Sequence, residues 1–154
     1  MYKTILSITI LSLLVLTSAC SNSTGHEEHE HEEAAGFRLT MNGDTIVEQL
    51  PGLGLTEGLD EIELHPNDET ALISIIFLAD DGDEFLPEDE DYNLGYEFST
   101  DGLVEFEQHA EDRRWSFHLH AEDSEGHVDL TLLLNHGDHH HFESDEIEIH
   151  VHAE

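Results

Sequence analysis

Short runs of alternating apolar and polar residues follow one another along most of the chain after residue 36. Phe37–Met41 alternates, and Asn42-Gly43 after it is a strong signal for a two-residue hairpin turn. Ala71–Ala79 is almost wholly apolar, which is typical of a central strand. Further strands are expected over residues 45–47, 62–64, 92–98, 103–109, 115–120, 128–135 and 146–152. Without a convincing amphipathic helix between them, these runs predict an all-β domain, an antiparallel β-sandwich.

The first 20 residues have the pattern of a secretion signal. A short positive start precedes the nearly apolar run Ile5–Leu16, which is too short for a comfortable membrane span. Leu16-Thr17-Ser18-Ala19-Cys20 resembles the lipobox of bacterial lipoproteins. The resemblance implies that residues 1–19 are removed, that Cys20 is acylated, and that the protein is anchored in the cell envelope. Ser21 directly after the cysteine favours the outer membrane in that comparison.

Residues 20–36 are predicted to form a flexible tether before a domain over 37–154. Within the tether, His26–Glu33 holds three histidines and five glutamates and has no apolar residue that could pack into a core. Imidazole binds zinc, nickel, cobalt and copper, so His26, His29 and His31 are candidate ligands. Such tails resemble those of proteins of bacterial zinc and nickel acquisition. The alternative is a solvated acidic spacer between the domain and the membrane.

Charge narrows the function classes. The 154 residues include 37 Asp and Glu against 4 Lys and Arg, for a formal net charge of −33. This excludes a nucleic-acid binder that works through a basic face. The single cysteine excludes a disulfide framework and a cysteine-based zinc site. Histidine is the unusual residue, with 14 in the chain.

Two of these histidines are expected on the outer face of one strand. Period-two alternation over 115–120 directs Trp115, Phe117 and Leu119 inward, and directs His118 and His120 outward. The two imidazoles are then about 6.6 Å apart at the backbone, from where both can lean onto one ion.

The preceding strand would add more ligands to this surface. If residues 110–114 close a hairpin, Glu107 and His109 lie beside His118 and His120. Three nitrogens and one carboxylate on one surface suit a tetrahedral or open zinc site.

The C-terminal third carries two more groups of histidines. His150 and His152 are predicted to face outward from the last strand, whereas its isoleucines face inward. The segment 136–141 is expected to be a loop suited to ion capture, with the candidate ligands His136, His139, His140 and His141. His65, before a proline turn, and His127, beside a glycine, have less support as ligands. The alternative for all of them is that histidine replaces lysine as a solubilising surface residue.

Other chemistry has less support. Asp80–Glu84 and Glu88–Asp91 offer oxygens to calcium, but their spacing does not fit an EF-hand loop, and hydrated acidic loops explain them equally well. There is no nucleophile setting, phosphate-binding glycine loop or metalloprotease helix motif in the sequence. A non-enzymatic protein is therefore expected.

Two segments resemble the bacterial immunoglobulin-like group 2 family. Ser99–Phe106 is similar to that family's Ser-Ser-Asp segment with the alternating strand after it, and Gly126–Thr131 is similar to a later Gly-containing strand. The resemblance covers roughly 62–152 and implies an immunoglobulin-like sandwich. Residues 107–122, which carry three of the histidines, depart from the family pattern. Because such domains serve as spacers, adhesion modules and displays, the fold implies little about function.

Together these features predict a lipid-anchored envelope protein that binds a divalent transition metal, most directly zinc. Nickel, cobalt and copper are the other metals that its ligands suit. The ion would be captured, delivered to an envelope metal transporter, or buffered. One alternative is a surface module for adhesion or scaffolding, whose acids and histidines serve solubility. Another is a pH-responsive protein whose histidines gain charge together.

Overall fold

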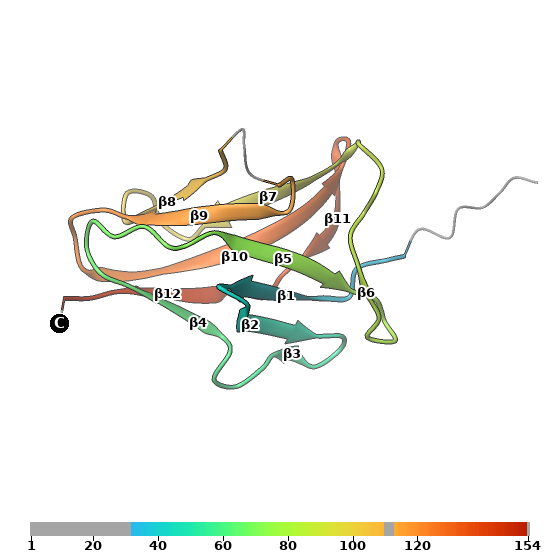
Figure 1. Cartoon of the computed structure of the whole chain (residues 1–154), viewed down its shortest axis with the longest axis horizontal. Helices are drawn as coiled ribbons and strands as arrows, with labels where there is room; N and C mark the ends of the chain where they lie inside the picture. The colour runs from blue at the N-terminus through green and yellow to red at the C-terminus, as the bar shows by residue number, and fades with distance from the viewer. Residues whose placement is uncertain (1–31, 110–112, 154) are drawn as a thin grey trace, which may run out of the picture. The chain divides into compact units, whose positions relative to one another are not determined.

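The structure is a computed structural model that describes residues 32–109 and 113–153. The described residues form β-strands, turns and irregular segments, with no helix among them. The predicted all-β sandwich is confirmed, and every run expected to be a strand contains one. Figure 1 shows its two layers, with β5 and β9 of one sheet in front of β10 and β12 of the other.

The first sheet contains seven strands in the order β3-β2-β1-β5-β9-β8, with β6 also paired to β5. Its strands are β1 (Gly36–Met41), β2 (Asp44–Leu50), β3 (Gly54–Leu55), β5 (Ile73–Leu78), β6 (Glu84–Phe85), β8 (Val104–Glu107) and β9 (Ser116–Ala121). The apolar run expected to be a central strand is β5, which pairs with β1, β6 and β9. The turn between β1 and β2 is the expected one, with positive φ at Asn42 and Gly43.

The second sheet contains five strands in the order β11-β10-β12-β4, with β7 on the other edge of β10. Its strands are β4 (Glu61–Leu64), β7 (Tyr92–Phe98), β10 (Gly126–His136), β11 (His139–Glu143) and β12 (Ile147–Val151). The long β10 pairs with β12 along residues 126–130 and with β11 along 133–136. All pairs are antiparallel in both sheets except β4 with β12, which are parallel.

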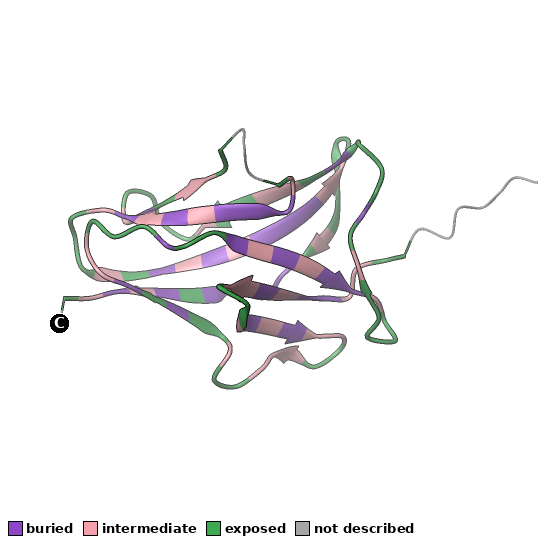
Figure 2. Cartoon of the chain, viewed as in Figure 1, coloured by how far each residue is buried: buried purple, intermediate pink, exposed green. Residues whose placement is uncertain are grey.

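The core lies between the two sheets and follows the period-two pattern of the sequence. Phe37, Phe77 and Phe117 from the first sheet and Ile147 and Ile149 from the second are fully buried. Burial alternates with exposure along β12 and β4, as Figure 2 shows for the strands in view. The outward positions of β8, β9 and β12 are thereby left for charged and imidazole side chains.

One predicted element is wrong. The loop expected over 136–141 is a hairpin, in which His136 pairs with His139 and Asn135 with His140. Gly137, with a φ of 57°, and Asp138 form its turn. His139, His140 and His141 are therefore strand residues rather than parts of a loop.

Candidate metal centre

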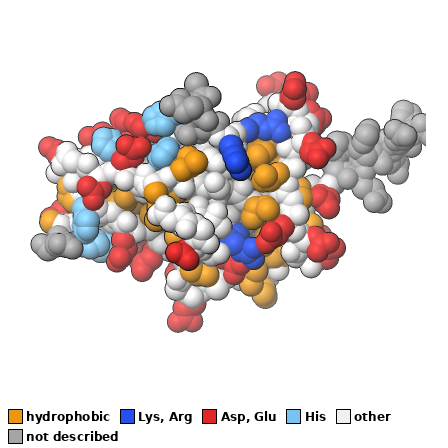
Figure 3. All heavy atoms as spheres, viewed as in Figure 1, with side chains coloured by type: hydrophobic (Ala, Val, Ile, Leu, Met, Phe, Trp, Pro, Cys, Tyr) orange, Lys and Arg blue, Asp and Glu red, His pale blue; other side chains and the backbone are white. Residues whose placement is uncertain are grey.

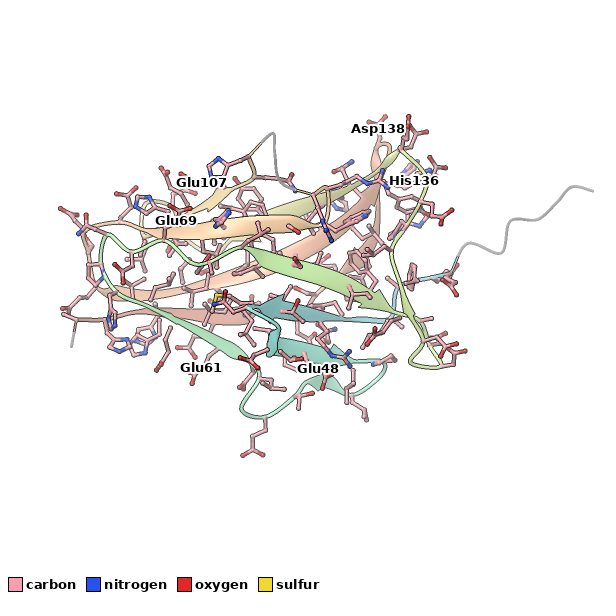
Figure 4. The ribbon with its side chains drawn as sticks, in the orientation of Figure 1. Glu48, Glu61, Glu69, Glu107, His136 and Asp138 are labelled. Atoms are coloured by element: carbon pink, nitrogen blue, oxygen red, sulfur yellow. The ribbon has the colours of Figure 1, made fainter. Side chains whose placement is uncertain are left out.

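The hairpin of β8 and β9 forms in the register that the sequence suggested. Glu107 lies opposite His118, and Glu105 lies opposite His120, on the outer face of the first sheet. His109 follows the end of β8. A third segment reaches this face from the other side, because Glu69 forms a bridge with His120. Figure 4 shows Glu69 and Glu107 near one another over β9.

Two groups of ligand atoms converge on this face. One atom from each of Glu69, His109 and His118 lies within 4.8 Å of the others, and the same holds for Glu105, Glu107 and His120. The groups adjoin each other, since His109 Nε2 is 3.6 Å from Glu107 Oε2. We call these six residues the hairpin patch. The four ligands expected from the sequence all lie in it, divided between the two groups.

His118 is oriented by the backbone. Its Nδ1 donates to the carbonyl oxygen of Thr70 over 2.9 Å, and Glu69 Oε1 is 3.4 Å from the same nitrogen. With the proton on Nδ1, the lone pair of the neutral ring is on Nε2. This is the usual arrangement of metal-binding histidines, whose second nitrogen donates to a carbonyl or carboxylate. The side chain of His118 is 16% exposed, so it is held while remaining reachable.

Sequence reasoning missed two residues of the hairpin patch as ligands. Glu105 shares the outward face of β8 with Glu107, and alternation alone could have identified it. Glu69 carries no such signal, because it belongs to an irregular segment whose position depends on tertiary pairing with β9.

A further group lies at the tip of the β10–β11 hairpin. Ligand atoms of Asp89, Asp91 and His136 lie within 4.8 Å of one another, and His136 Nε2 is 3.9 Å from Asp89 Oδ2. The ring of Tyr92 stacks on the ring of His136 with their centroids 4.3 Å apart, and the ring centroid of His141 is 5.2 Å from that of His136. Figure 4 places His136 and Asp138 together at this tip, away from Glu69 and Glu107.

Tyr92 packs against this group with its phenol uncharged. Burial raises the pKa of Tyr92, and the negative charges of Asp89 and Glu33 raise it further. The phenol therefore keeps its proton at neutral pH and contributes packing rather than an anionic ligand. His139 and His140 are exposed on β11, outside the group of Asp89, Asp91 and His136.

The remaining predicted residues are placed as follows. His150 faces outward from β12 beside His127, and His152, directly after the end of β12, lies beside His65. Cys20, His26, His29 and His31 lie outside the described residues.

The acidic segment Asp80–Glu84 is partly engaged within the fold, since Glu84 forms an ion pair with Arg38. The hydrogen bond from Arg38 to Glu48 is the main cause that raises the pKa of this guanidinium.

The surface around these groups is strongly acidic. Figure 3 shows histidines gathered among Asp and Glu side chains toward one end of the visible face. Negative side chains concentrate cations near the imidazoles and orient protonated rings. Over residues 32–109 and 113–153, no segment forms a helix that is long and apolar enough to cross a membrane.

Comparisons with models of protein families, with curated proteins and with solved structures found no match for this chain. The resemblances to lipoproteins and to immunoglobulin-like group 2 domains therefore stay predictions from the sequence. Any assignment of function depends on the chemistry of the clusters themselves.

Proposed function

We propose that this protein binds a divalent transition metal ion, most directly zinc, at the hairpin patch. The observation that supports this most is the convergence of Glu69, His109 and His118 within 4.8 Å, with His118 held through its Nδ1. Imidazole and carboxylate together suit zinc. Three protein ligands leave the fourth coordination position open for water or for a ligand atom of the molecule that delivers the ion.

The exposure of the hairpin patch favours exchange over permanent retention. Glu69 and His109 are exposed and His118 is half-buried, so an ion bound there stays accessible to solvent. The second group, of Glu105, Glu107 and His120, offers an adjoining position through which an ion can move. Structural zinc sites are usually closed by four protein ligands. The hairpin patch therefore fits a protein that captures, buffers or passes on metal without catalysing a reaction.

The N-terminal segment gives this activity a place in the cell. In our proposal Cys20 carries the lipid anchor, and His26, His29 and His31 form a tether that collects ions close to the membrane. More than one acyl chain makes such an anchor durable. The natural recipient of the ion is a metal transporter of the envelope.

Zinc titration of the chain from Ser21 to Glu154 tests the proposal. This chain keeps every described residue, and calorimetry in chelator-treated buffer at pH 7.5 gives affinity and stoichiometry. His118→Ala with His120→Ala should remove one class of sites or weaken it at least about 100-fold, because losing even a residue that orients a ligand costs about 10–100-fold. His139→Ala with His140→Ala is the matched control and should leave that class unchanged.

A companion variant separates the tether from the domain. Deletion of residues 25–33 should reduce the number of weak sites and leave the class that depends on His118 and His120. If all zinc binding disappears with the tether, the hairpin patch is not the site. If neither part binds zinc, the surface-module alternative takes its place.

A further inference from the structure

Four histidines line the outer face of the second sheet, two of them within strands and two directly after the end of a strand. His127 on β10 lies directly opposite His150 on β12, and His152 directly follows the end of β12, two residues beyond His150. His65 follows β4, which pairs in parallel with β12, so it lies beside His152. We call His65, His127, His150 and His152 the imidazole ladder.

Neighbouring rings of the imidazole ladder are in contact. The ring centroids of His127 and His150 are 4.0 Å apart and those of His150 and His152 are 4.7 Å apart. The rings of His65 and His152 are 5.4 Å apart. Two imidazoles that bind one tetrahedral ion at about 2.0–2.1 Å have centroids about 5 Å apart. The spacing on either side of His152 is close to that value.

Two of the four rings are already held through Nδ1. His65 Nδ1 donates to the carbonyl oxygen of His152 over 2.8 Å, and His127 Nδ1 donates to Glu148 Oε1 over 2.6 Å. In both rings the lone pair is consequently on Nε2. A carbonyl or carboxylate that accepts from the second ring nitrogen is the partner that metal-binding histidines usually have.

His152 supplies the second, independent observation. Its Nδ1 is buried and has no hydrogen-bond partner in the described part of the chain. Buried polar atoms are nearly always satisfied, so an unsatisfied ring nitrogen among three other imidazoles needs an explanation. A bound cation is a partner that would satisfy it.

We propose that the imidazole ladder is a second metal site, which takes a transition metal ion of the zinc, copper and nickel class through imidazole nitrogens. His152 is the central ligand, with His65 and His150 on either side of it. No three nitrogens of these rings lie within 4.8 Å of one another as they stand, so the side chains rotate to bring them onto one ion. His127, held by Glu148, supplies a further nitrogen after rotation of its exposed side chain. A set of neutral nitrogen ligands favours these metals over magnesium and calcium, which prefer oxygen.

The site is separate from the hairpin patch, which lies on the other sheet. An experiment can therefore disprove metal binding at one of the two sites without affecting the proposal for the other. His65 and His127 had little support from the sequence, because neither belongs to a recognisable histidine cluster. Strand pairing brings them to β12.

The test is a zinc titration of the chain from Ser21 in the His118→Ala, His120→Ala background. His150→Gln with His152→Gln should remove one further zinc equivalent. His139→Gln with His140→Gln changes two exposed histidines of β11 and should remove none. Far-ultraviolet circular dichroism checks that each variant keeps its β-structure. An unchanged stoichiometry in the His150, His152 variant overturns the proposal.

A second measurement uses the chain without substitutions in the ladder. Ring ¹⁵N resonances of His65, His150 and His152 report directly on proton and metal binding. We expect Nδ1 of His152 to shift on zinc addition at pH 7.5, and magnesium at the same concentration to leave it unchanged. Ladder resonances that do not respond to saturating zinc overturn this site, whereas the resonances of His118 and His120 report on the proposed function separately.

Discussion

At the scale of single residues, Thr70 links the hairpin patch to the core through two hydrogen bonds. Its hydroxyl oxygen accepts the N–H of the buried Leu119 over 3.0 Å, and its carbonyl accepts from His118 Nδ1. The residue is itself buried, so no solvent replaces these partners easily. Thr70 therefore supports both the strand that carries the histidines and the orientation of one of them.

Replacement of the Thr70 hydroxyl should show how much its hydrogen bond to Leu119 contributes to stability. Thr70→Val leaves the N–H of Leu119 without its acceptor, and we expect the free energy of unfolding to fall by about 1–3 kcal/mol. Thr70→Ser keeps the hydroxyl and should lose less. Urea denaturation of the two variants and the parent chain measures the difference. Equal stability of Thr70→Val and the parent would contradict the structural role assigned to this hydrogen bond.

Imidazole ligation also predicts a dependence on pH. Imidazole in model peptides protonates near pH 6.5, and a protonated ring cannot bind metal. Zinc affinity should therefore weaken about tenfold for each imidazole ligand between pH 7.5 and 5.5. Calorimetry at pH 7.5, 6.5 and 5.5 measures the change. Full affinity at pH 5.5 would indicate carboxylate ligands without histidine.

Alternation along the sequence predicts which side chains face the core, but not what covers the outer face. Phe117 and Leu119 are fully buried and His118 and His120 face outward, as the pattern requires. Ser116 precedes His118 by two residues, so alternation places it on the same outer face, yet it is only 1% exposed. It pairs with Ser74 of β5, with the two hydroxyl oxygens 3.0 Å apart. The same kind of tertiary pairing brings Glu69 to the hairpin patch.

At the scale of elements, the β1–β2 hairpin depends on its two-residue turn. Gly43 has a φ of 93°, where a side chain is strained even though a Cβ would meet no neighbouring atom. We expect Gly43→Ala to lower the free energy of unfolding by about 1–2 kcal/mol. Asn42→Gly is the matched control, because glycine adopts positive φ without penalty, and it should cost far less. A Gly43→Ala variant as stable as Asn42→Gly would argue against this turn.

The β10–β11 hairpin shows where element prediction fails. Three consecutive histidines, His139 to His141, hide the alternation that identifies a strand, and Phe142 is the apolar residue that packs against the core from β11. Pairing with β10 supplies the order that the local sequence does not. The turn signal was present in Gly137-Asp138, as Asn42-Gly43 was for the first hairpin. Turn residues are thus the better guide when histidine replaces hydrophobic residues.

At the scale of the whole molecule, negative charge greatly exceeds positive charge. The chain carries a formal net charge of −33, and two of its arginines are already engaged, Arg38 with Glu48 and Arg114 with the carbonyls of Pro87 and Asp89. Such an excess attracts cations to the histidine clusters. It also destabilises the compact state through repulsion between carboxylates.

Salt should therefore stabilise this protein. The screening length falls from about 10 Å at 0.1 M to about 3 Å at 1 M salt, which reduces repulsion between carboxylates on the surface of one domain. We expect the thermal midpoint to rise by several degrees between 0.1 and 1 M sodium chloride, measured with a chelator present so that metal binding plays no part. Potassium chloride should act equally, because screening depends on ionic strength. A midpoint that falls with salt would mean that ion pairs such as Arg38–Glu48 contribute more to stability than repulsion takes away.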